Sequence, residues 1–332
     1  MRKYPYINFG PLKRDFLLGK IQNQGQSAGN IALQSKGDGS SETTRETFIL
    51  NNNFKFWFIG FTEGVGSFSV NKDGLLEFKI TLPSVNANIL FYIKKELAFG
   101  IVRVQDKKNK THCFKVNNKE GLLKIISIFN GNLYLESRKE QFKLWLIAVN
   151  KFYLVAPLHK EISYIENLSK PSLDNSWLSG FTETTGCFTC SIIDKPNKDS
   201  LVKLNFSLVP FVKPLASFAF AFGTKTFPKA KVQKGNFETM NHLAEILGGK
   251  THFSGGALLE KYNGYCTSIN TTKLSKTIRY FKTYPLKTKK SIIYFNWYKI
   301  YKLVSVKKHL TNNELNNVKT YINNLNRLYK QI

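Results

Sequence analysis

The chain has 332 residues, and its 49 Lys and Arg against 22 Asp and Glu give a formal net charge of +27. Such an excess is typical of proteins that bind polyanions, although charge alone does not distinguish DNA from RNA. No apolar run reaches 18 residues, which argues against a membrane span. The four cysteines are Cys113, Cys187, Cys190 and Cys266. We expect reduced structural thiols, because the single CxxC lies on a predicted strand that would turn its cysteines to opposite faces.

The first segment, residues 1–47, is basic at its start and rich in Gly, Ser, Thr and Gln from residue 22 onward. It has no apolar period, so we expect a disordered extension. Two other interpretations are open. The segment could be a mitochondrial presequence, against which Asp15 argues, or it could be left from a reading frame fused to upstream coding sequence.

Residues 48–156 form a first predicted lobe with the element order αββαββα. The alternation of apolar and polar residues predicts strands, and the helical spacing of apolar residues predicts helices. The expected elements are a helix at 54–64, strands at 67–71 and 76–81, a helix at 88–99, strands at 101–106 and 111–117, and helices at 120–129 and 136–150.

Polar side chains alternate along these strands and end at a lysine-rich turn, so we predict that one face of the sheet contacts nucleic acid. The candidate residues are Ser69, Asn71, Lys79, Thr81, Arg103, Gln105, Lys107, Lys108, Lys115 and Asn117.

A predicted linker at 157–175, with a short helix, leads to a second lobe at 176–310 that repeats the same order. The expected elements are a helix that begins near 176, strands at 187–192 and 202–209, a helix at 237–247, strands at 250–253 and 265–270, and helices at 273–282 and 288–304. The candidate nucleic-acid contacts here are Thr189, Ser191, Lys203, Asn205 and Ser207 on the strands, Lys229 and Lys231 in a basic insertion at 210–236, and Lys287 and Lys289. Residues 311–332 predict a C-terminal amphipathic helix that opens with a capping box.

One segment occurs twice. Residues 56–68 read FWFIGFTEGVGSF, and residues 176–188 read SWLSGFTETTGCF. The repeat distance is 120 residues, from Gly60 to Gly180, which suits a duplicated domain. Each copy predicts a helix with small residues one turn apart, Gly60 with Gly64 and Gly180 with Thr184. Such flat faces let two helices approach closely, so we predict that the copies pack against each other.

Both segments resemble the motif of the LAGLIDADG homing endonucleases and intron maturases, in the single-chain form with two motifs. The resemblance covers roughly residues 50–310. It implies an α+β fold of two pseudo-symmetric lobes, joined at the paired motif helices and forming a saddle-shaped nucleic-acid-binding surface. In the family, strands of this kind lie in the DNA major groove, where side chains can distinguish all four base pairs.

The resemblance also implies that a nuclease would carry an acid at the eighth motif position of each copy. Val65 and Thr185 stand there instead. Glu63 and Glu183 lie two residues earlier, a rotation of about 200° along a helix, so they should face away from a metal at the helix ends. We therefore expect no catalytic residues and no metal site, with Glu63, Glu183 and Lys289 as residual candidates.

Two further family positions also differ. The polar residue that typically follows the second strand of each repeat aligns with Leu82 and Pro210. The basic residue near the end of each repeat aligns with Lys289 in the second copy and with Glu136 in the first. We expect no cofactor, and Mg²⁺ only if some nuclease activity remains.

The favoured hypothesis is a maturase, an RNA-binding protein without enzymatic activity that assists group I intron splicing. One alternative is an intron-encoded DNA homing endonuclease with metal-dependent double-strand cleavage. Another is a non-catalytic RNA- or DNA-binding protein such as a mitoribosome component, or a relic without activity. The expected partner is structured RNA or double-stranded DNA, bound by a monomer, with accessory splicing proteins as further candidates. The abundance of Lys, Asn, Ile, Phe and Tyr predicts a fungal mitochondrial, organelle-encoded protein.

Overall fold

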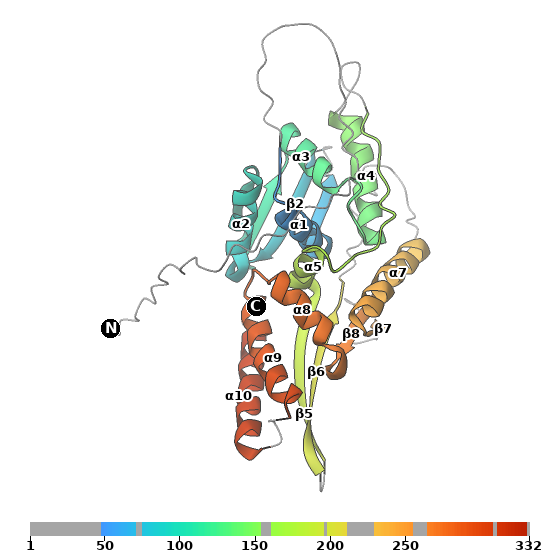
Figure 1. Ribbon diagram of the computed structural model, residues 1–332. Coiled ribbons are helices and arrows are strands. Elements are labelled where there is room, and N and C mark those ends of the chain that lie inside the picture. Colours follow the sequence, from blue (N-terminus) through green and yellow to red (C-terminus); the bar gives the residue numbers. More distant parts are fainter. Residues whose placement is uncertain are drawn as a thin grey trace, which may run out of the picture. The chain divides into compact units, whose positions relative to one another are not determined.

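The computed structural model describes residues 48–70, 75–153, 161–195, 198–210, 229–254, 264–307 and 311–330 (Figure 1). Phe48–Ile332 form one compact unit. The predicted extension at 1–47 and residues 211–228 of the predicted insertion lie outside the described residues. None of the helices in the described ranges has the length and apolar character needed to cross a membrane.

The first lobe contains four antiparallel strands in the order β1-β2-β4-β3, with helices before, between and after the two hairpins. Its elements are α1 (Asn52–Val65), β1 (Gly66–Val70), β2 (Leu76–Pro83), the short 3₁₀ helix η1 (Ser84–Asn86), α2 (Ala87–Leu97), β3 (Ile101–Asp106), β4 (Thr111–Val116), α3 (Lys119–Phe129) and α4 (Glu136–Tyr153).

The second lobe repeats this order, and its strands lie in the equivalent sequence β5-β6-β8-β7. Its elements are α5 (Trp177–Thr185), β5 (Gly186–Lys195), β6 (Lys198–Leu208), α7 (Lys229–Leu247), β7 (Lys250–Ser254), β8 (Gly264–Asn270), η4 (Thr271–Lys273), α8 (Ser275–Thr283), α9 (Lys290–Ser305) and the C-terminal α10 (Asn312–Tyr329). The predicted fold class, two lobes with the order αββαββα, is confirmed.

Each lobe has an aromatic core between its sheet and its helices. In the first lobe, Phe68 lies with its ring centroid 5.4 Å from Phe129 and 5.3 Å from Trp145. In the second lobe, Phe188 lies 5.0 Å from Phe206 and 5.8 Å from Phe281. Large aromatic side chains of this kind supply most of the apolar area that a core buries, so the helices hold each sheet by its apolar face.

Two element predictions were wrong. The described part of the linker, residues 161–175, contains no helix. The helix expected at 237–247 starts at Lys229, eight residues earlier, so the C-terminal part of the predicted insertion belongs to α7. Its first turns carry Lys, Gln and Gly without an apolar stripe, and periodicity alone therefore did not reveal them.

The C-terminal helix and α9 cover part of the open edge of β5, one of the two edge strands of the second sheet. The Tyr329 hydroxyl accepts the Phe188 N–H at 2.7 Å and donates to the Phe188 carbonyl at 3.2 Å. The indole N–H of Trp297 donates to the Thr189 carbonyl at 2.9 Å. Backbone groups that a neighbouring strand would otherwise bond are thus satisfied by side chains.

Candidate nucleic-acid interface

The two motif helices, α1 and α5, pack against each other at their glycines. A Cβ atom built on Gly60 would lie 2.0 Å from the Trp177 carbonyl oxygen, and one on Gly180 would lie 1.8 Å from the Trp57 carbonyl oxygen. A Cβ on Gly64 would lie 1.7 Å from the Thr184 hydroxyl. Only glycine permits the backbone approach at Gly60 and Gly180. The structure thus places all four predicted lobe-interface residues, including Thr184, at the contact between the helices.

The C-terminal ends of α1 and α5 present Val65 and Thr185, where the family resemblance implies acids. Val65 is half-buried and packs on the apolar core. Thr185 is buried, and its hydroxyl donates to the Phe181 carbonyl at 2.7 Å. Neither side chain offers a carboxylate oxygen, which is the ligand that Mg²⁺ prefers in proteins.

The Glu63 carboxylate points to the body of the protein. It accepts the backbone N–H groups of Tyr134 at 2.8 Å and Leu135 at 2.6 Å, and the indole N–H of Trp177 at 2.5 Å. Glu63 is 1 % exposed, and burial raises its pKa to about 7 against the opposing effect of these donors. Glu63 therefore connects α1 to the start of α4 and to the motif helix of the other lobe.

Glu183 has the matching role in the second lobe. Its carboxylate accepts the backbone N–H groups of Lys287 and, at 3.1 Å, Thr288, together with the Thr288 hydroxyl at 2.5 Å. Burial raises the pKa of Glu183, and these hydrogen bonds act in the opposite direction. Both glutamates thus bond to backbone N–H groups near the start of the last helix of their repeat, in the orientation that the helical rotation predicts.

A buried basic side chain caps the end of each motif helix. The Arg138 guanidinium donates to the carbonyls of Glu63 at 2.7 Å, Gly66 at 2.9 Å and Gly64 at 3.2 Å. The Lys290 ammonium donates to the carbonyls of Thr182 at 3.1 Å and Gly186 at 2.6 Å. These bonds satisfy carbonyls that a helix end leaves without partners, and the cations oppose the negative end of the helix dipole.

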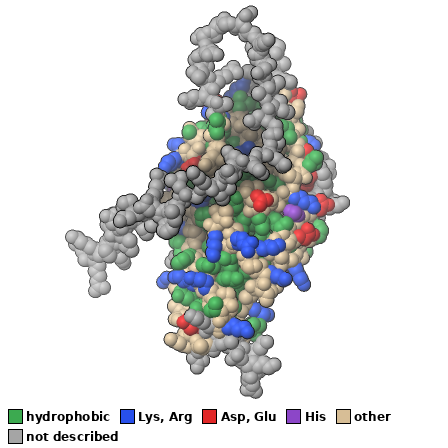
Figure 2. Space-filling view, in the orientation of Figure 1, with side chains coloured by type: hydrophobic (Ala, Val, Ile, Leu, Met, Phe, Trp, Pro, Cys, Tyr) green, Lys and Arg blue, Asp and Glu red, His purple; other side chains and the backbone are tan. Residues whose placement is uncertain are grey.

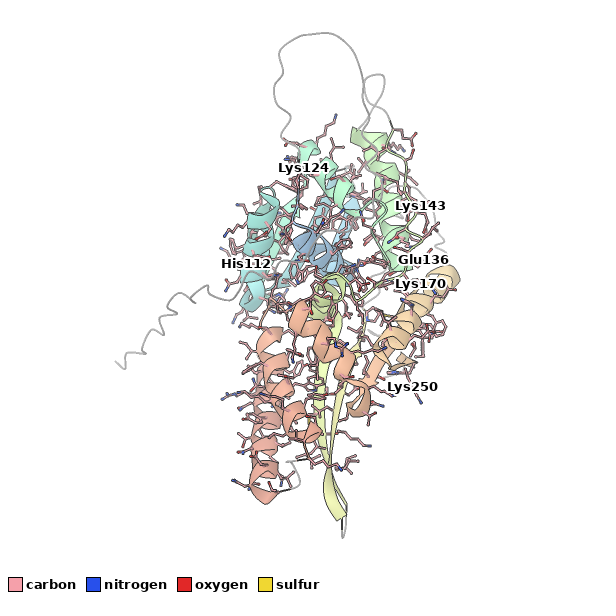
Figure 3. All side chains as sticks on the ribbon, viewed as in Figure 1. His112, Lys124, Glu136, Lys143, Lys170 and Lys250 are labelled. Carbon is pink, nitrogen blue, oxygen red and sulfur yellow. The ribbon has the colours of Figure 1, made fainter. Side chains whose placement is uncertain are left out.

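The two capping residues differ from the residues aligned with the family's basic positions, and that alignment stays a prediction. The side chain that meets the motif-helix end is Lys290, one residue after Lys289, and in the first lobe it is Arg138, two residues after Glu136. Lys289 is exposed, and Glu136 occupies the first turn of α4 (Figure 3). A basic group is therefore present in both lobes.

A signal for the caps was present in the sequence. Arg138 continues the buried stripe of α4 through Phe142, Trp145 and Val149, and Lys290 continues that of α9 through Ile293, Trp297 and Ile300. A basic residue at a core position of an amphipathic helix indicates a buried partner. Burial lowers the pKa of Arg138 to about 10 and that of Lys290 to about 8, while Glu63 and Glu183 act in the opposite direction.

A cleft of about 180 Å³ adjoins the end of α1. Its lining includes Val65, Leu82, Thr184 and Lys289, together with Glu183, whose carboxylate is already hydrogen-bonded to Lys287 and Thr288. The aliphatic side chains of Val65 and Leu82 thus stand where a metal-dependent site would need polar oxygens. Within the described ranges, no three His, Cys, Asp or Glu side chains gather closely enough to hold a metal. The residues at the motif-helix ends therefore do not fit the divalent metal that the family's nuclease chemistry requires.

The polar face of the first sheet brings predicted contact residues together. The register pairs Ser69 with Glu77 and Lys79 with Lys115. Glu77 bridges the two lysines, at 2.8 Å from the Lys79 ammonium and 2.6 Å from that of Lys115. Burial raises the pKa of Glu77, but the hydrogen bonds and charges of Lys115 and Lys79 outweigh it and leave the pKa below its ordinary value.

The remaining candidates of this lobe lie along the same face or beyond it. Thr81 and Arg103 share one row through Cys113, with which each is paired. Gln105 lies at an irregularity between Val104 and Asp106. The other exposed candidates are Lys107 and Lys108 in the β3–β4 turn and Asn117 after β4.

The second sheet repeats this polar face. Thr189 pairs with Asn205, Ser191 with Lys203, and Cys187 with Ser207. Cys190 pairs with Leu204 on the opposite face, so the CxxC cysteines separate as predicted. Burial raises the pKa of the Cys190 thiol to about 12, which makes this thiol a poor metal ligand or nucleophile.

Other predicted contacts lie off the sheets. The exposed Lys287 has its ammonium 5.4 Å from the centroid of the Tyr92 ring, across the boundary between the lobes. Asn71 lies outside the described residues, and Lys229 and Lys231 are described only as backbone in the first turn of α7. The structure therefore groups the strand candidates on two polar faces, while their contacts with nucleic acid stay predictions.

Two αββαββα lobes joined at paired glycine-bearing helices, each with one polar sheet face, define a duplicated nucleic-acid-binding fold. The family model described as LAGLIDADG endonuclease matches residues 58–149 and 178–301. The chain belongs to the LAGLIDADG endonuclease family.

Known relatives include an endonuclease and a maturase. The chain is 51 % identical over 329 residues to "Probable intron-encoded endonuclease 4" of Neurospora crassa, covering 98 % of this chain and 53 % of that protein. The chain thus spans about half the length of this relative. It is 28 % identical over 136 residues to "Intron-encoded RNA maturase bI4" of Saccharomyces cerevisiae, covering 41 % of this chain and 19 % of that protein.

Among solved structures, the LAGLIDADG homing endonuclease I-LtrWI bound to target DNA matches with a TM-score of 0.60 and 21 % identity, covering 82 % of this chain and 97 % of that chain. This similarity supports the two-lobed fold. The names of these relatives agree better with the endonuclease alternative than with the favoured maturase hypothesis.

Proposed function

We propose that this protein binds nucleic acid without cutting it, and that it acts as a maturase that stabilises the folded form of a group I intron. The observation that carries this proposal is the lack of an available carboxylate at the end of either motif helix. Val65 and Thr185 replace the acids, while Glu63 and Glu183 are committed to backbone N–H groups. An intron supplies its own splicing chemistry, so an RNA-binding partner has no need of these acids.

The charge and the sheets support RNA or DNA as the partner. The net charge of +27 favours polyanion binding, and two polar sheet faces provide donors and acceptors at regular spacing. The relative named as an RNA maturase supports this role in part of the chain. A mitochondrial location and accessory splicing proteins remain predictions from composition and from the family.

The endonuclease alternative rests on the name of the Neurospora crassa relative, which is 51 % identical to this chain. For this function, two glutamates would have to leave buried hydrogen-bonded positions and turn to the helix ends. Unpairing the backbone N–H groups they bond costs about 1–3 kcal/mol for each buried group. We therefore favour the maturase role.

The test is splicing of a precursor RNA containing the group I intron in which the reading frame lies, at low magnesium, with and without the purified protein. Stoichiometric protein should speed splicing. A second arm uses the Lys79→Gln, Lys115→Gln variant, which alters the polar sheet face and should fold normally but speed splicing less. If splicing is unchanged and the protein linearises a plasmid that carries the intron's flanking sequence in a magnesium-dependent manner, the endonuclease alternative is correct instead.

A further inference from the structure

The outer surface of α8 is basic along its whole length. Four basic side chains are exposed at intervals of three residues: Lys273, at the end of η4, and Lys276, Arg279 and Lys282, on α8. Ile278 and other side chains between them are buried. We call these four residues the α8 basic face. In Figure 2, Lys and Arg side chains gather over the part of the molecule where Figure 1 places α8.

The α8 basic face lies on the helical side of the second sheet. The ring of Phe281, on α8, lies 5.8 Å from that of Phe188 and 5.6 Å from that of Phe206. These two rings belong to the apolar sheet face, and the strand residues adjacent to them, such as Thr189 and Asn205, point to the opposite side. A duplex lying on the polar sheet faces would therefore leave the α8 basic face free.

No acid in this part of the sequence balances the charge. Residues 261–313 contain 12 Lys and Arg and no Asp or Glu. The equivalent helix of the first lobe, α3, is different: its Lys124, shown in Figure 3, pairs with Glu120 at 2.9 Å, and Leu123 and Ser127 are among its other exposed residues. The concentration of charge is thus a property of the second lobe rather than of the fold.

Cation–π contacts with an aromatic ring position two of the lysine side chains in this region. The ammonium groups of Lys282 and Lys302 lie 5.9 Å and 5.4 Å from the centroid of the Tyr298 ring. Tyr298 is itself stacked between Tyr294 and Tyr301, at 6.1 Å and 6.2 Å. Contacts between cations and aromatic faces restrict long lysine side chains, and preorganised side chains lose less conformational entropy when they bind.

We propose that the α8 basic face binds the phosphate backbone of a second segment of a folded RNA, separate from the segment held on the polar sheet faces. This inference rests on the proposed RNA-binding function and extends it to a second surface. A folded RNA has helices that reach around a protein, whereas a short DNA duplex has one axis. RNA binding should therefore depend on α8, and binding of a short duplex should not.

The experiment compares two triple variants of equal charge change. Lys273→Gln, Arg279→Gln, Lys282→Gln alters the α8 basic face and retains Lys276, whose ammonium donates to the Ile246 carbonyl at the end of α7. Lys94→Gln, Lys95→Gln, Lys170→Gln is the matched control and removes three exposed lysines outside the second lobe. Binding is measured by fluorescence anisotropy over a series of salt concentrations, with a labelled group I intron transcript and a short labelled DNA duplex.

The α8 variant should bind the transcript about tenfold more weakly at moderate salt. The slope of the logarithm of its binding constant against the logarithm of the salt concentration should be smaller in magnitude by about 2, as expected for three lost phosphate contacts. The control variant should change affinity by less than about twofold, and the duplex should bind both equally. An equal loss in the two variants, an equal loss for duplex and transcript, or no transcript binding by the unmodified protein would each overturn the proposal.

Splicing separates this proposal from the proposed function. If the unmodified protein speeds splicing but the α8 variant binds the transcript normally, the second surface is wrong and the maturase role stands. If the α8 variant alone loses transcript binding and the unmodified protein leaves splicing unchanged, the second surface stands and the maturase role is wrong. Equal thermal unfolding of both variants and the unmodified protein establishes that each is folded.

Discussion

The indole N–H of Trp177 donates to the Glu63 carboxylate at 2.5 Å, so a side chain on the motif helix of one lobe bonds to a carboxylate on that of the other. The pseudo-symmetric partner of Trp177 is Trp57, whose buried indole N–H has no hydrogen-bond partner among the described residues. Glu183, which would be its acceptor by symmetry, bonds to Thr288 instead. The duplicated motif is therefore symmetric in its backbone packing and asymmetric in its hydrogen bonds.

Gly60→Ala should destabilise the protein by about 3 kcal/mol or more, because the added methyl group would overlap the Trp177 carbonyl and force the lobes apart. Chemical denaturation measures this change. The control is Gly264→Ala, whose Cβ would meet its nearest neighbour, the Pro210 carbonyl oxygen, at 3.9 Å. Similar stabilities for the two variants would contradict the helix contact described here.

The raised pKa of Glu63 predicts a dependence of stability on pH. Since burial raises this pKa from 4.5 to about 7, the folded protein holds a proton that the unfolded chain has lost between these values. Its contribution is complete below about pH 4.5 and is lost as the pH rises through about 7, with a total of about 3 kcal/mol.

Glu63→Gln removes this titration. The variant should be less stable than the unmodified protein at pH 5, because an amide accepts fewer hydrogen bonds than a carboxyl group at this position. The difference should narrow as the pH rises to 8. Urea denaturation at several pH values measures it, with the exposed Glu120→Gln as control. A difference that stays constant from pH 5 to 8 contradicts the assigned pKa.

Arg138→Met should cost about 3–5 kcal/mol, because it leaves three carbonyls at the end of α1 without a donor and Glu63 without its nearby cation. Lys290→Met should cost less, since the Lys290 ammonium contacts two carbonyls. Thermal unfolding compares the two with the exposed control Lys151→Met. A larger loss of stability from Lys290→Met would contradict the expectation that the cap with more hydrogen bonds contributes more.

Glu77→Gln should strengthen nucleic-acid binding, because Glu77 neutralises both Lys79 and Lys115 on the polar face of the first sheet. We expect an affinity gain of about threefold to tenfold at low salt and a steeper dependence on salt. Filter binding with labelled RNA and DNA measures it, and Glu120→Gln, on α3, is the matched control. A loss of affinity would mean that the carboxylate, rather than the lysines, contacts the ligand.

The double variant Val65→Asp, Thr185→Asp should bind Mn²⁺ weakly, and neither single variant should bind it, because one carboxylate cannot bridge both lobes. Calorimetric titration measures this binding. Efficient double-strand cleavage should not return, since Leu82 and Pro210 also replace polar residues of the family pattern. Robust magnesium-dependent cleavage by the unmodified protein would contradict the hypothesis that the nuclease site is inactive.

The doubled motif and the strand alternation together predicted the fold, because Gly60 and Gly180 can only be explained by a close helix contact and Phe68 and Phe188 by a buried sheet face. The capping roles of Arg138 and Lys290 were harder to predict from the sequence. A basic residue at a core position of α4 or α9 indicates a buried partner, but the sequence does not show that this partner is a helix end 70 or more residues away.

The hydrogen bond from Trp177 to Glu63 could not be predicted for a different reason. The two motif copies are alike in sequence at these positions, with Trp57 and Trp177 equivalent and Glu63 and Glu183 equivalent. The partner of each tryptophan depends on Thr288, which supplies a competing hydroxyl in one lobe only. Such choices are made by tertiary contacts and not by the local pattern.

The hydrogen bonds of Tyr329 and Trp297 to the backbone of β5 affect how the protein behaves in solution. An unpaired strand edge is a template for the strands of neighbouring molecules, and monomers avoid self-association by covering it. Tyr329 is the last residue of α10, whereas Trp297 belongs to α9. A chain that ends before α10 would keep both lobes, their motif contact and Trp297, yet it would expose the Phe188 backbone groups at the strand edge and should aggregate as its concentration rises.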